Sequence, residues 1–324
     1  AQDAPGLKAA LEAASRGDVA KAVALKAGLE RLDAKIVDWT LARNGAVNAD
    51  AITDFAIKNP GWPDPDTLRR RAEEALEREN PPAGEVVRAF GGTQPQSSRG
   101  AMLLARAHLA TGNRAAAAEI IRKAWREHTM NDETESALLG EFASLLTAAD
   151  HRVRLDRALL KSKSDDAMTT ARQLGPGYVA LVKARLAVEK KAANAGALLD
   201  AVPADIKDEP AYLFGRAQWA RRQERWQEAA QLLLKAPKDP RAMVVPDEWW
   251  EEKRIVSRQL LELGDARTAY RVVQGHTGSS RAMQAEAEFH AGWYALRFLK
   301  DPAAAIGHFK RVQTASPSPI TQAR

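Results

Sequence analysis

The side chains best suited to metal binding or acid–base chemistry are spread widely along this chain. It contains six histidines and no cysteine. No two histidines lie four residues apart and no H-E-x-x-H motif occurs, so the spacing that holds zinc on one helix face is missing. We therefore predict no metal-binding residue. The histidines are His108, His128, His151, His276, His290 and His308.

One loop has the composition of a phosphate-binding site. The stretch GHTGSS, residues 275–280, is rich in glycine and hydroxyl side chains. It lacks the Gly-Lys-Ser/Thr ending and the preceding strand of a P-loop, so we interpret it as a loop between two helical hairpins. The sequence also has no G-x-S-x-G and no G-x-G-x-x-G motif. We predict neither a nucleophile nor a cofactor-binding residue.

Aromatic side chains could stack on sugar rings or bases. Trp249 and Trp250 are adjacent, and adjacent helical residues point about 100° apart, so at most one would face a ligand. We interpret this pair as packing between helices. Nucleic-acid binding would need basic and aromatic residues clustered on one face, whereas these charges are mixed in sign, so no nucleic-acid partner is predicted. Packing is also the interpretation for a second aromatic group, Phe289, Trp293, Tyr294 and Phe298.

An internal repeat indicates the elements that would position any site. Five stretches align at a turn residue, and an alanine follows five residues later in each of them. The residue seven before the turn is small in four stretches, which lets two paired helices approach closely. The turn residues are Gly17, Gly112, Glu224, Gly264 and Lys300, the alanines are Ala22, Ala117, Ala229, Ala269 and Ala305, and the small residues are Ala10, Ala105, Ala217 and Ser257, with Trp293 as the exception.

The remaining segments are also predicted to be helical. Asp132 and Asp150 are interpreted as helix caps, and residues 175–177 as a break between two helices. No alternating run bounded by hairpin turns indicates a strand. We predict an all-α superhelical stack of antiparallel helix hairpins, an α-solenoid of the tetratricopeptide or HEAT type that could curve into a ring. The loop-like stretch 91–98 separates an N-terminal helical portion, residues 1–90, from repeat-rich hairpins, residues 91–324, which continue the same superhelix.

A proline-rich corner shows how such hairpins could be joined. Three prolines between residues 60 and 65 each push the preceding residue out of the helical region, so one helix ends there and another starts at about Pro65. Asp64 or Asp66 is expected to cap the new helix. Trp62 is expected to fill the junction as an apolar plug.

The charge and the ends of the chain limit its partners only loosely. There are 48 basic and 42 acidic residues, a net charge of +6, which permits an anionic polymer as partner without requiring one. Local pairs at i,i+4, Arg69 with Glu73 and Arg70 with Glu74, are expected to neutralise part of it. No apolar run approaches the roughly 20 residues of a membrane span, and none is predicted. The opening AQDAPG resembles the product of signal-peptide cleavage and favours export, although a trimmed chain would look the same.

Two blocks of sequence carry a family resemblance. The first, at about residues 36–78, contains WTLARNGAVNADAITDFAIKNPGWPDPDTLRRRAEEAL. The second, residues 246–324, contains WWEEKRIVSRQLLELGDARTAYRVVQGH, AEAEFHAGWYALRFLKDPAAAIGHFKRV and SPITQAR. Both resemble the soluble lytic murein transglycosylases of Gram-negative bacteria, and the second is similar to the last hairpins of that family's α-superhelical domain. The segment between the blocks matches only in being helical.

The resemblance implies a periplasmic enzyme, exported with its signal peptide removed, whose helical superhelix precedes a linker and a lysozyme-like catalytic domain. That domain cleaves the MurNAc-GlcNAc bond of peptidoglycan with one glutamate and leaves a 1,6-anhydro sugar. This chain would be the non-catalytic superhelical domain. Its implied partners are peptidoglycan, bound as glycan strands or stem peptides on a basic concave surface, and the linker and catalytic domains of the parent.

The catalytic signature of that family is incomplete here. It is a Glu-Ser pair followed shortly by Gly-Leu-Met-Gln. Glu135 and Ser136 supply the pair, but the single Met-Gln, Met283 and Gln284, lies far along the chain. Protonating a glycosidic oxygen needs a carboxyl group kept protonated in an apolar cleft, whereas Glu135 lies at a predicted helix start, where the dipole favours the ionised form. We predict no catalytic residue and no activity of this chain alone.

Two alternatives stay open. A helical-repeat scaffold that binds a protein partner would use the same concave surface and have no connection with glycan cleavage. An enzyme complete in this chain would need a catalytic group that the sequence does not show.

Overall fold

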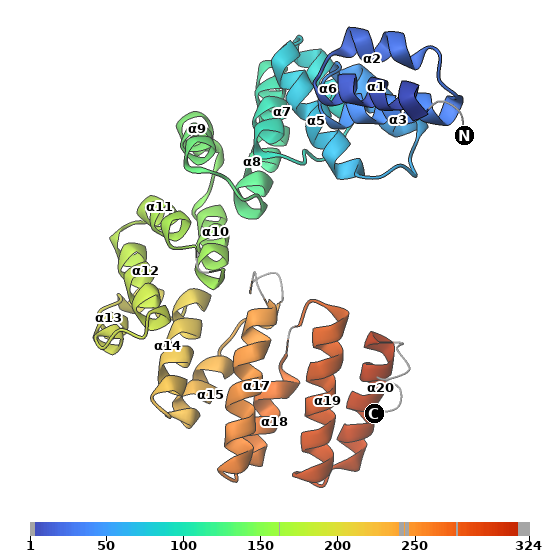
Figure 1. The fold of residues 1–324 in the computed structure, drawn as a ribbon. Helices are drawn as coiled ribbons and strands as arrows, with labels where there is room; N and C mark the ends of the chain where they lie inside the picture. The colour runs from blue at the N-terminus through green and yellow to red at the C-terminus, as the bar shows by residue number, and fades with distance from the viewer. Residues whose placement is uncertain (1–3, 162, 240–242, 244–245, 277, 317–324) are drawn as a thin grey trace. The chain divides into compact units, whose positions relative to one another are not determined.

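The computed structural model describes residues 4–161, 163–239, 243, 246–276 and 278–316. Within these ranges the chain forms helices and no strand, which confirms the all-α prediction. Contacts between residues divide it into two compact units, Ala1–Thr147 and Ala148–Arg324. Each unit is a stack of antiparallel helical hairpins, the architecture of an α-solenoid (Figure 1).

The first unit pairs α1 with α2, α4 with α5 and α7 with α8. Its helices are α1 (Ala4–Ser15), α2 (Val19–Lys26), α3 (Arg31–Arg43), α4 (Ala49–Lys58), α5 (Pro65–Glu79), α6 (Ala83–Phe90), α7 (Ser98–Ala110), α8 (Arg114–Glu127) and α9 (Asp132–Phe142), followed by a 3₁₀ turn, Ala143–Leu145.

The second unit pairs α10 with α11, α14 with α15, α17 with α18 and α19 with α20. Its helices are α10 (Ala148–Leu160), α11 (Ser164–Leu174), α12 (Pro176–Glu189), α13 (Ala195–Asp200), a 3₁₀ turn (Ala204–Ile206), α14 (Pro210–Arg222), α15 (Trp226–Leu234), α17 (Pro246–Glu262), α18 (Ala266–Gln274), α19 (Arg281–Arg297) and α20 (Pro302–Ala315). No described helix combines the length and apolar character that crossing a bilayer requires.

The predicted repeat is confirmed at its turns and its alanines. All five turn residues have a positive φ, between 56° and 83°, the left-handed conformation that closes a helix. Each alanine five residues later is almost completely buried between the paired helices. The residue after the turn caps the second helix in four hairpins, where an Asp or Asn side chain accepts an N–H bond three residues on, a feature not predicted: Asp18, Asn113, Asp265 and Asp301.

The exception in the repeat, Trp293, has a geometric cause. In four hairpins the N–H of the residue after the turn binds the carbonyl five residues earlier, whereas Asp301 binds the carbonyl of Ala295, six residues earlier. The last turn is thus one residue longer, and the small position falls on Gly292. A Cβ on Gly292 would lie 2.7 Å from the Phe309 ring. All five hairpins therefore have a small residue at the close approach, and Trp293 is turned away from it.

The proline corner also forms largely as predicted. Helix α5 begins at Pro65, and Trp62 packs edge-on against Phe55, with ring centroids 5.5 Å apart. The capping prediction is wrong for Asp64. This residue has a φ of 58° and its carboxylate accepts a bond from Arg43 Nε at 2.8 Å, so it makes no cap bond to α5.

Glu73 differs most from expectation. It was predicted on a solvated face, paired with Arg69, but it is buried and binds the loop before α7. Its carboxylate accepts bonds from the backbone N–H of Gln96 at 2.6 Å and of Ser97 at 3.0 Å, and from Ser97 Oγ at 2.6 Å. Burial raises the pKa of Glu73 despite these bonds. The carboxylate therefore joins α5 to the start of α7.

Smaller corrections concern neighbouring positions. Glu74 pairs with Arg71 at 2.7 Å, three residues away, and Arg70 is not its partner. Helix α9 is capped by Asn131, one residue before the predicted Asp132.

The predicted segment boundaries are confirmed in part. The break predicted at residues 175–177 is confirmed, because α11 ends at Leu174 and α12 begins at Pro176. Asp150 is buried inside α10, so its prediction as a cap is wrong. Of the predicted stretch 91–98, residues 91–97 connect α6 to α7 and Ser98 begins α7. This connection lies within the first unit, where Phe90 and Leu104 share one apolar core. That one superhelix runs through both units stays a prediction.

Candidate functional site

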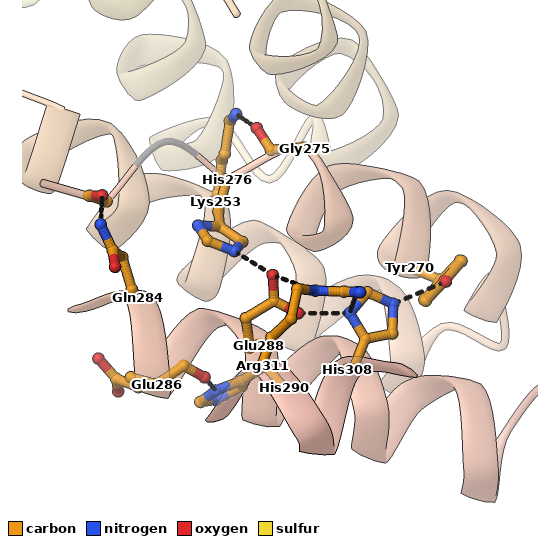
Figure 2. Close-up of polar contacts among 11 residues, drawn as sticks. Lys253, Tyr270, Gly275, His276, Gln284, Glu286, Glu288, His290, His308 and Arg311 are labelled. Atoms are coloured by element: carbon orange, nitrogen blue, oxygen red, sulfur yellow. Dashed lines mark hydrogen bonds and ion pairs between the residues drawn. The ribbon is translucent and has the colours of Figure 1, made fainter. Parts of the chain in front are cut away.

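A cluster of ionisable side chains joins the last two hairpins (Figure 2). Glu288 Oε1 accepts bonds from His276 Nε2 at 3.0 Å and from Arg311 Nε at 2.9 Å. Glu288 Oε2 lies 2.6 Å from His308 Nδ1, and the other ring nitrogen of His308 lies 2.9 Å from the Tyr270 hydroxyl. An ionised carboxylate only accepts, so each histidine presents an N–H to it.

The cluster links the last two hairpins, and its carboxylate is not a proton donor. Burial alone would raise the pKa of Glu288, but the bonds from His276, His308 and Arg311 outweigh it and hold that pKa far below its usual range. Glu288 is therefore ionised at neutral pH. Across the described residues, no three His, Asp or Glu side chains are arranged to hold a metal ion. The three histidines outside this hairpin region lie on or beside other helices: His108, His128 and His151.

A second polar row connects α17 to α19. Glu286 accepts bonds from Trp250 Nε1 at 3.0 Å and from Arg254 at 2.7 Å. Burial would raise the pKa of Glu286, but these bonds lower it overall. His290 Nδ1 lies 2.8 Å from the Glu286 carbonyl and Nε2 lies 3.0 Å from Arg258. Burial lowers the pKa of His290, so its neutral form donates through Nδ1 and accepts through Nε2.

The loop 275–280 connects α18 to α19, as predicted, with residue 277 outside the described residues. Several of its described polar groups bond within the protein. The carbonyl of Gly275 accepts a bond from the buried Lys253 Nζ at 2.6 Å (Figure 2). The backbone N–H and hydroxyl of Ser279 donate to Asp247 at 2.9 and 3.1 Å. A carboxylate thus occupies donors that a phosphate would need.

Beside these rows lies an open groove of about 490 Å³. Its lining includes a stripe of α19 that carries Phe289 and Trp293, and Trp293 is 37% exposed. Arg258 of α17 also lines the groove. The complete lining is Arg258, Ala282, Ala285, Glu286, Phe289, His290, Trp293, Val312 and Ser316.

The aromatic predictions are confirmed in part. Trp249 and Trp250 are buried in the core of the second unit, and so is Tyr294. Trp293 and Phe298 are only partly packed. Trp293 lines the groove, and Phe298 is 42% exposed. The longer last turn is the reason, and a signal was present in the sequence: the repeat aligned a tryptophan where every other hairpin has a small residue.

The residues of the incomplete catalytic signature lie on different helices. Glu135 lies in the first turn of α9, as predicted, but is buried, which was not predicted. Met283 and Gln284 lie in the first turn of α19, and Gln284 donates to the carbonyl of Gly278 at 3.1 Å. Glu135 belongs to the first unit and the Met-Gln pair to the second.

Comparisons with known proteins add little to this site. No protein-family model matches the sequence, and no curated protein matches it. Among solved structures, the chain is similar to one in the "Crystal structure of APC/C hetero-tetramer Cut9-Hcn1", with 12% identity and a TM-score of 0.36 over 99% of this chain. It covers 62% of that chain, less than two thirds. A similarity of this extent carries no argument about partners or function.

Proposed function

We propose that this chain is a non-catalytic helical-repeat module that binds a partner protein. The groove on α19 carries the proposal, because among the described residues an apolar stripe is left uncovered on a stack of hairpins whose other large aromatic residues are mostly buried. Helical solenoids bind their partners on the extended surfaces that stacked repeats form. A half-exposed tryptophan on such a surface is the residue type that anchors protein interfaces.

The chemistry around the groove supports a binding role. Glu286 and Glu288 are both held ionised by bonded cations and ring N–H groups, so neither can donate a proton as a general acid. His290 is fixed between a carbonyl and a guanidinium. These side chains hold helices together, and their hydrogen-bonding capacity is largely consumed by that task.

A second candidate function rests on the sequence blocks at residues 36–78 and 246–324. They favour the superhelical domain of a periplasmic lytic murein transglycosylase, which would bind glycan strands or stem peptides while a separate domain cleaves them. The more specific block supplies α17 to α20, including His308 and Phe309, which hold the last hairpin together.

One pair of binding assays separates the candidates. The purified chain is sedimented with peptidoglycan sacculi and, separately, used to capture proteins from a bacterial lysate. A stoichiometric protein complex that survives gel filtration supports the scaffold. Sedimentation with sacculi and no such complex would overturn the scaffold in favour of the murein candidate. Loss of turbidity in a sacculus suspension would contradict both, because it would show catalysis by this chain.

A further inference from the structure

The start of α14 is bonded to two earlier helices of the second unit through one carboxylate. Glu209 directly precedes α14 and makes no side-chain cap bond to it. Its Oε1 accepts bonds from Arg152 Nη1 of α10 at 3.3 Å and from the Tyr178 hydroxyl of α12 at 2.9 Å. Arg152 thus attaches α10 to the start of α14.

A second carboxyl group on α10 is buried beside this junction. Asp156 is 8% exposed, and among the described residues its carboxyl group has no hydrogen bond and no ion pair. Burial raises the pKa of Asp156 from its usual 3.8 to about 7, and the charge of Glu209 adds to the increase. Arg185 and Arg152 act in the opposite direction without cancelling it. Asp156 is therefore neutral in mild acid and loses its proton near neutral pH.

The two cations near Asp156 differ in their freedom to move. Arg185 of α12 is 6% exposed, and its Nη1 donates to the carbonyl of Ala211 at 2.8 Å. A Cβ on Gly215 would collide with Arg185 Cδ, so α14 packs closely on this side chain. The side chain of Arg152 is 46% exposed and lies four residues before Asp156. Residues four apart are neighbours on one helix face, so Arg152 can reach Asp156 by a change of rotamer.

We propose that Arg152 moves between two carboxylates according to the protonation state of Asp156. While Asp156 holds its proton, Arg152 bonds to Glu209 and α10 stays attached to the start of α14. When Asp156 releases the proton to solvent, two carboxylates compete for one guanidinium, and the attachment of α10 weakens. Helix α10 begins the second unit, so this unit holds its first helix more firmly in mild acid than at alkaline pH. This behaviour is independent of the scaffold function proposed above.

The charged groups that act on Asp156 come from several elements. They are Glu209 before α14, Arg185 of α12 and Arg152 of α10 itself, with the Tyr178 hydroxyl in the same cluster. Helix α11 also packs along α10, and its charged residues are Asp165, Asp166 and Arg172. All of these groups are the same in the wild type and in Asp156→Asn, so the difference between the two proteins reports the proton on Asp156.

This proton can be followed directly. The full chain, labelled with ¹³C at the aspartate side-chain carboxyl, is titrated by NMR, and Asp156→Asn identifies the signal that disappears. That signal should titrate near pH 7. In Glu209→Gln, which removes the neighbouring charge and keeps an acceptor for Tyr178, the midpoint should move to lower pH. A wild-type midpoint near the usual 3.8 would overturn the inference, because Asp156 would then be ionised throughout the neutral range.

Hydrogen exchange of the α10 amides tests the attachment of the helix. Opening of α10 exposes Asp156 to water, where its pKa returns to about 3.8. Relative to Asp156→Asn, the opening constant of the wild type should therefore rise about tenfold per pH unit between pH 5 and pH 7 and then level off. Asp165→Asn, at an exposed position of α11, is the matched control and should keep this rise. An opening constant with the same pH dependence in wild type and Asp156→Asn would overturn the inference.

The movement of Arg152 has its own readout. Crystal structures of the full chain at about pH 5.5 and pH 8.5, on either side of the expected transition, should show Arg152 bonded to Glu209 in the first and to Asp156 in the second. Arg152 bonded to Glu209 alone at the higher pH would refute the exchange of partners.

Discussion

Replacing Lys253 with methionine should abolish a specific pH dependence of stability. Lys253 is 4% exposed, and its Nζ donates to the carbonyl of Gly275 at the end of α18. Burial lowers the pKa of this lysine from its usual 10.5 to about 8. One pKa unit corresponds to about 1.4 kcal/mol, so keeping the ammonium ion in the fold costs about 3 kcal/mol at pH 7. Methionine fills a similar volume without a charge.

The direction in which stability changes with pH follows from the two pKa values of Lys253. The unfolded chain holds the Lys253 proton up to about pH 10.5, whereas the folded chain releases it near pH 8. The penalty is therefore present in full below pH 8 and disappears as the pH rises through 10.5. At pH 7 the variant avoids this penalty but loses a charged hydrogen bond worth about 1.5–3 kcal/mol, so the two proteins should differ by about 1.5 kcal/mol or less. Between pH 7 and pH 10 the wild type should gain about 2–3 kcal/mol relative to the variant.

The assay is urea unfolding of the full chain, followed by far-ultraviolet circular dichroism at several pH values between 7 and 10. The quantity compared is the difference in unfolding free energy between wild type and Lys253→Met at each pH. Lys183→Met, at an exposed position of α12, serves as the control and should show a constant difference. A constant difference for Lys253→Met as well would refute the argument, since Lys253 would then have the same pKa in the folded and unfolded chain.

Three further substitutions test other contacts. Trp62→Ala should lower the unfolding free energy by about 2–3 kcal/mol, because it empties the junction of α4 and α5. Capture of a partner on α19 should stay unchanged. Loss of the partner with unaltered stability would contradict this prediction. Gly292→Ala should cost about 1–3 kcal/mol, because the new Cβ meets the Phe309 ring, and a neutral result in thermal unfolding would remove the close approach from the argument. Glu288→Gln should cost about 2 kcal/mol at pH 7. Because the pKa of Glu288 is lowered in the fold, that difference should shrink as the pH falls below about 4, and urea unfolding at pH 3 and pH 7 checks it.

The sequence predicted those features of the fold that depend on neighbours along the chain. Turn residues, buried alanines and helix breaks repeat at fixed spacing, so one hairpin explains the next. A sixth turn of the same kind was missed. Lys191 has a φ of 55° and the N–H of Ala192 binds the carbonyl of Ala187, but the alanine position is taken by Gly196 and the following helix, α13, is short. Without the alanine and a long apolar pattern, the sequence offered no alignment.

Contacts between distant residues could not be predicted in this way. Glu73 was assigned to a solvated face because Arg69 lies one turn before it, yet its partners are in the loop before α7. Glu288 collects His276 and His308 from two other elements. Spacing on one helix identifies only i,i+3 and i,i+4 neighbours. Which carboxylate meets which loop depends on how the helices stack, and that information is spread over many apolar side chains.

The hydrogen-bonding groups that line the groove determine which kind of partner fits it. A glycan presents many hydroxyl groups, each of which needs a donor or an acceptor when it leaves water. In this groove Glu286 and His290 already use their polar atoms on Trp250, Arg254 and Arg258. The other α19 side chains that line the groove, Ala282, Ala285, Phe289 and Trp293, offer carbon surface and one indole. A helix satisfies its own backbone hydrogen bonds and can bring apolar side chains, so it covers such a surface without leaving polar groups unpaired.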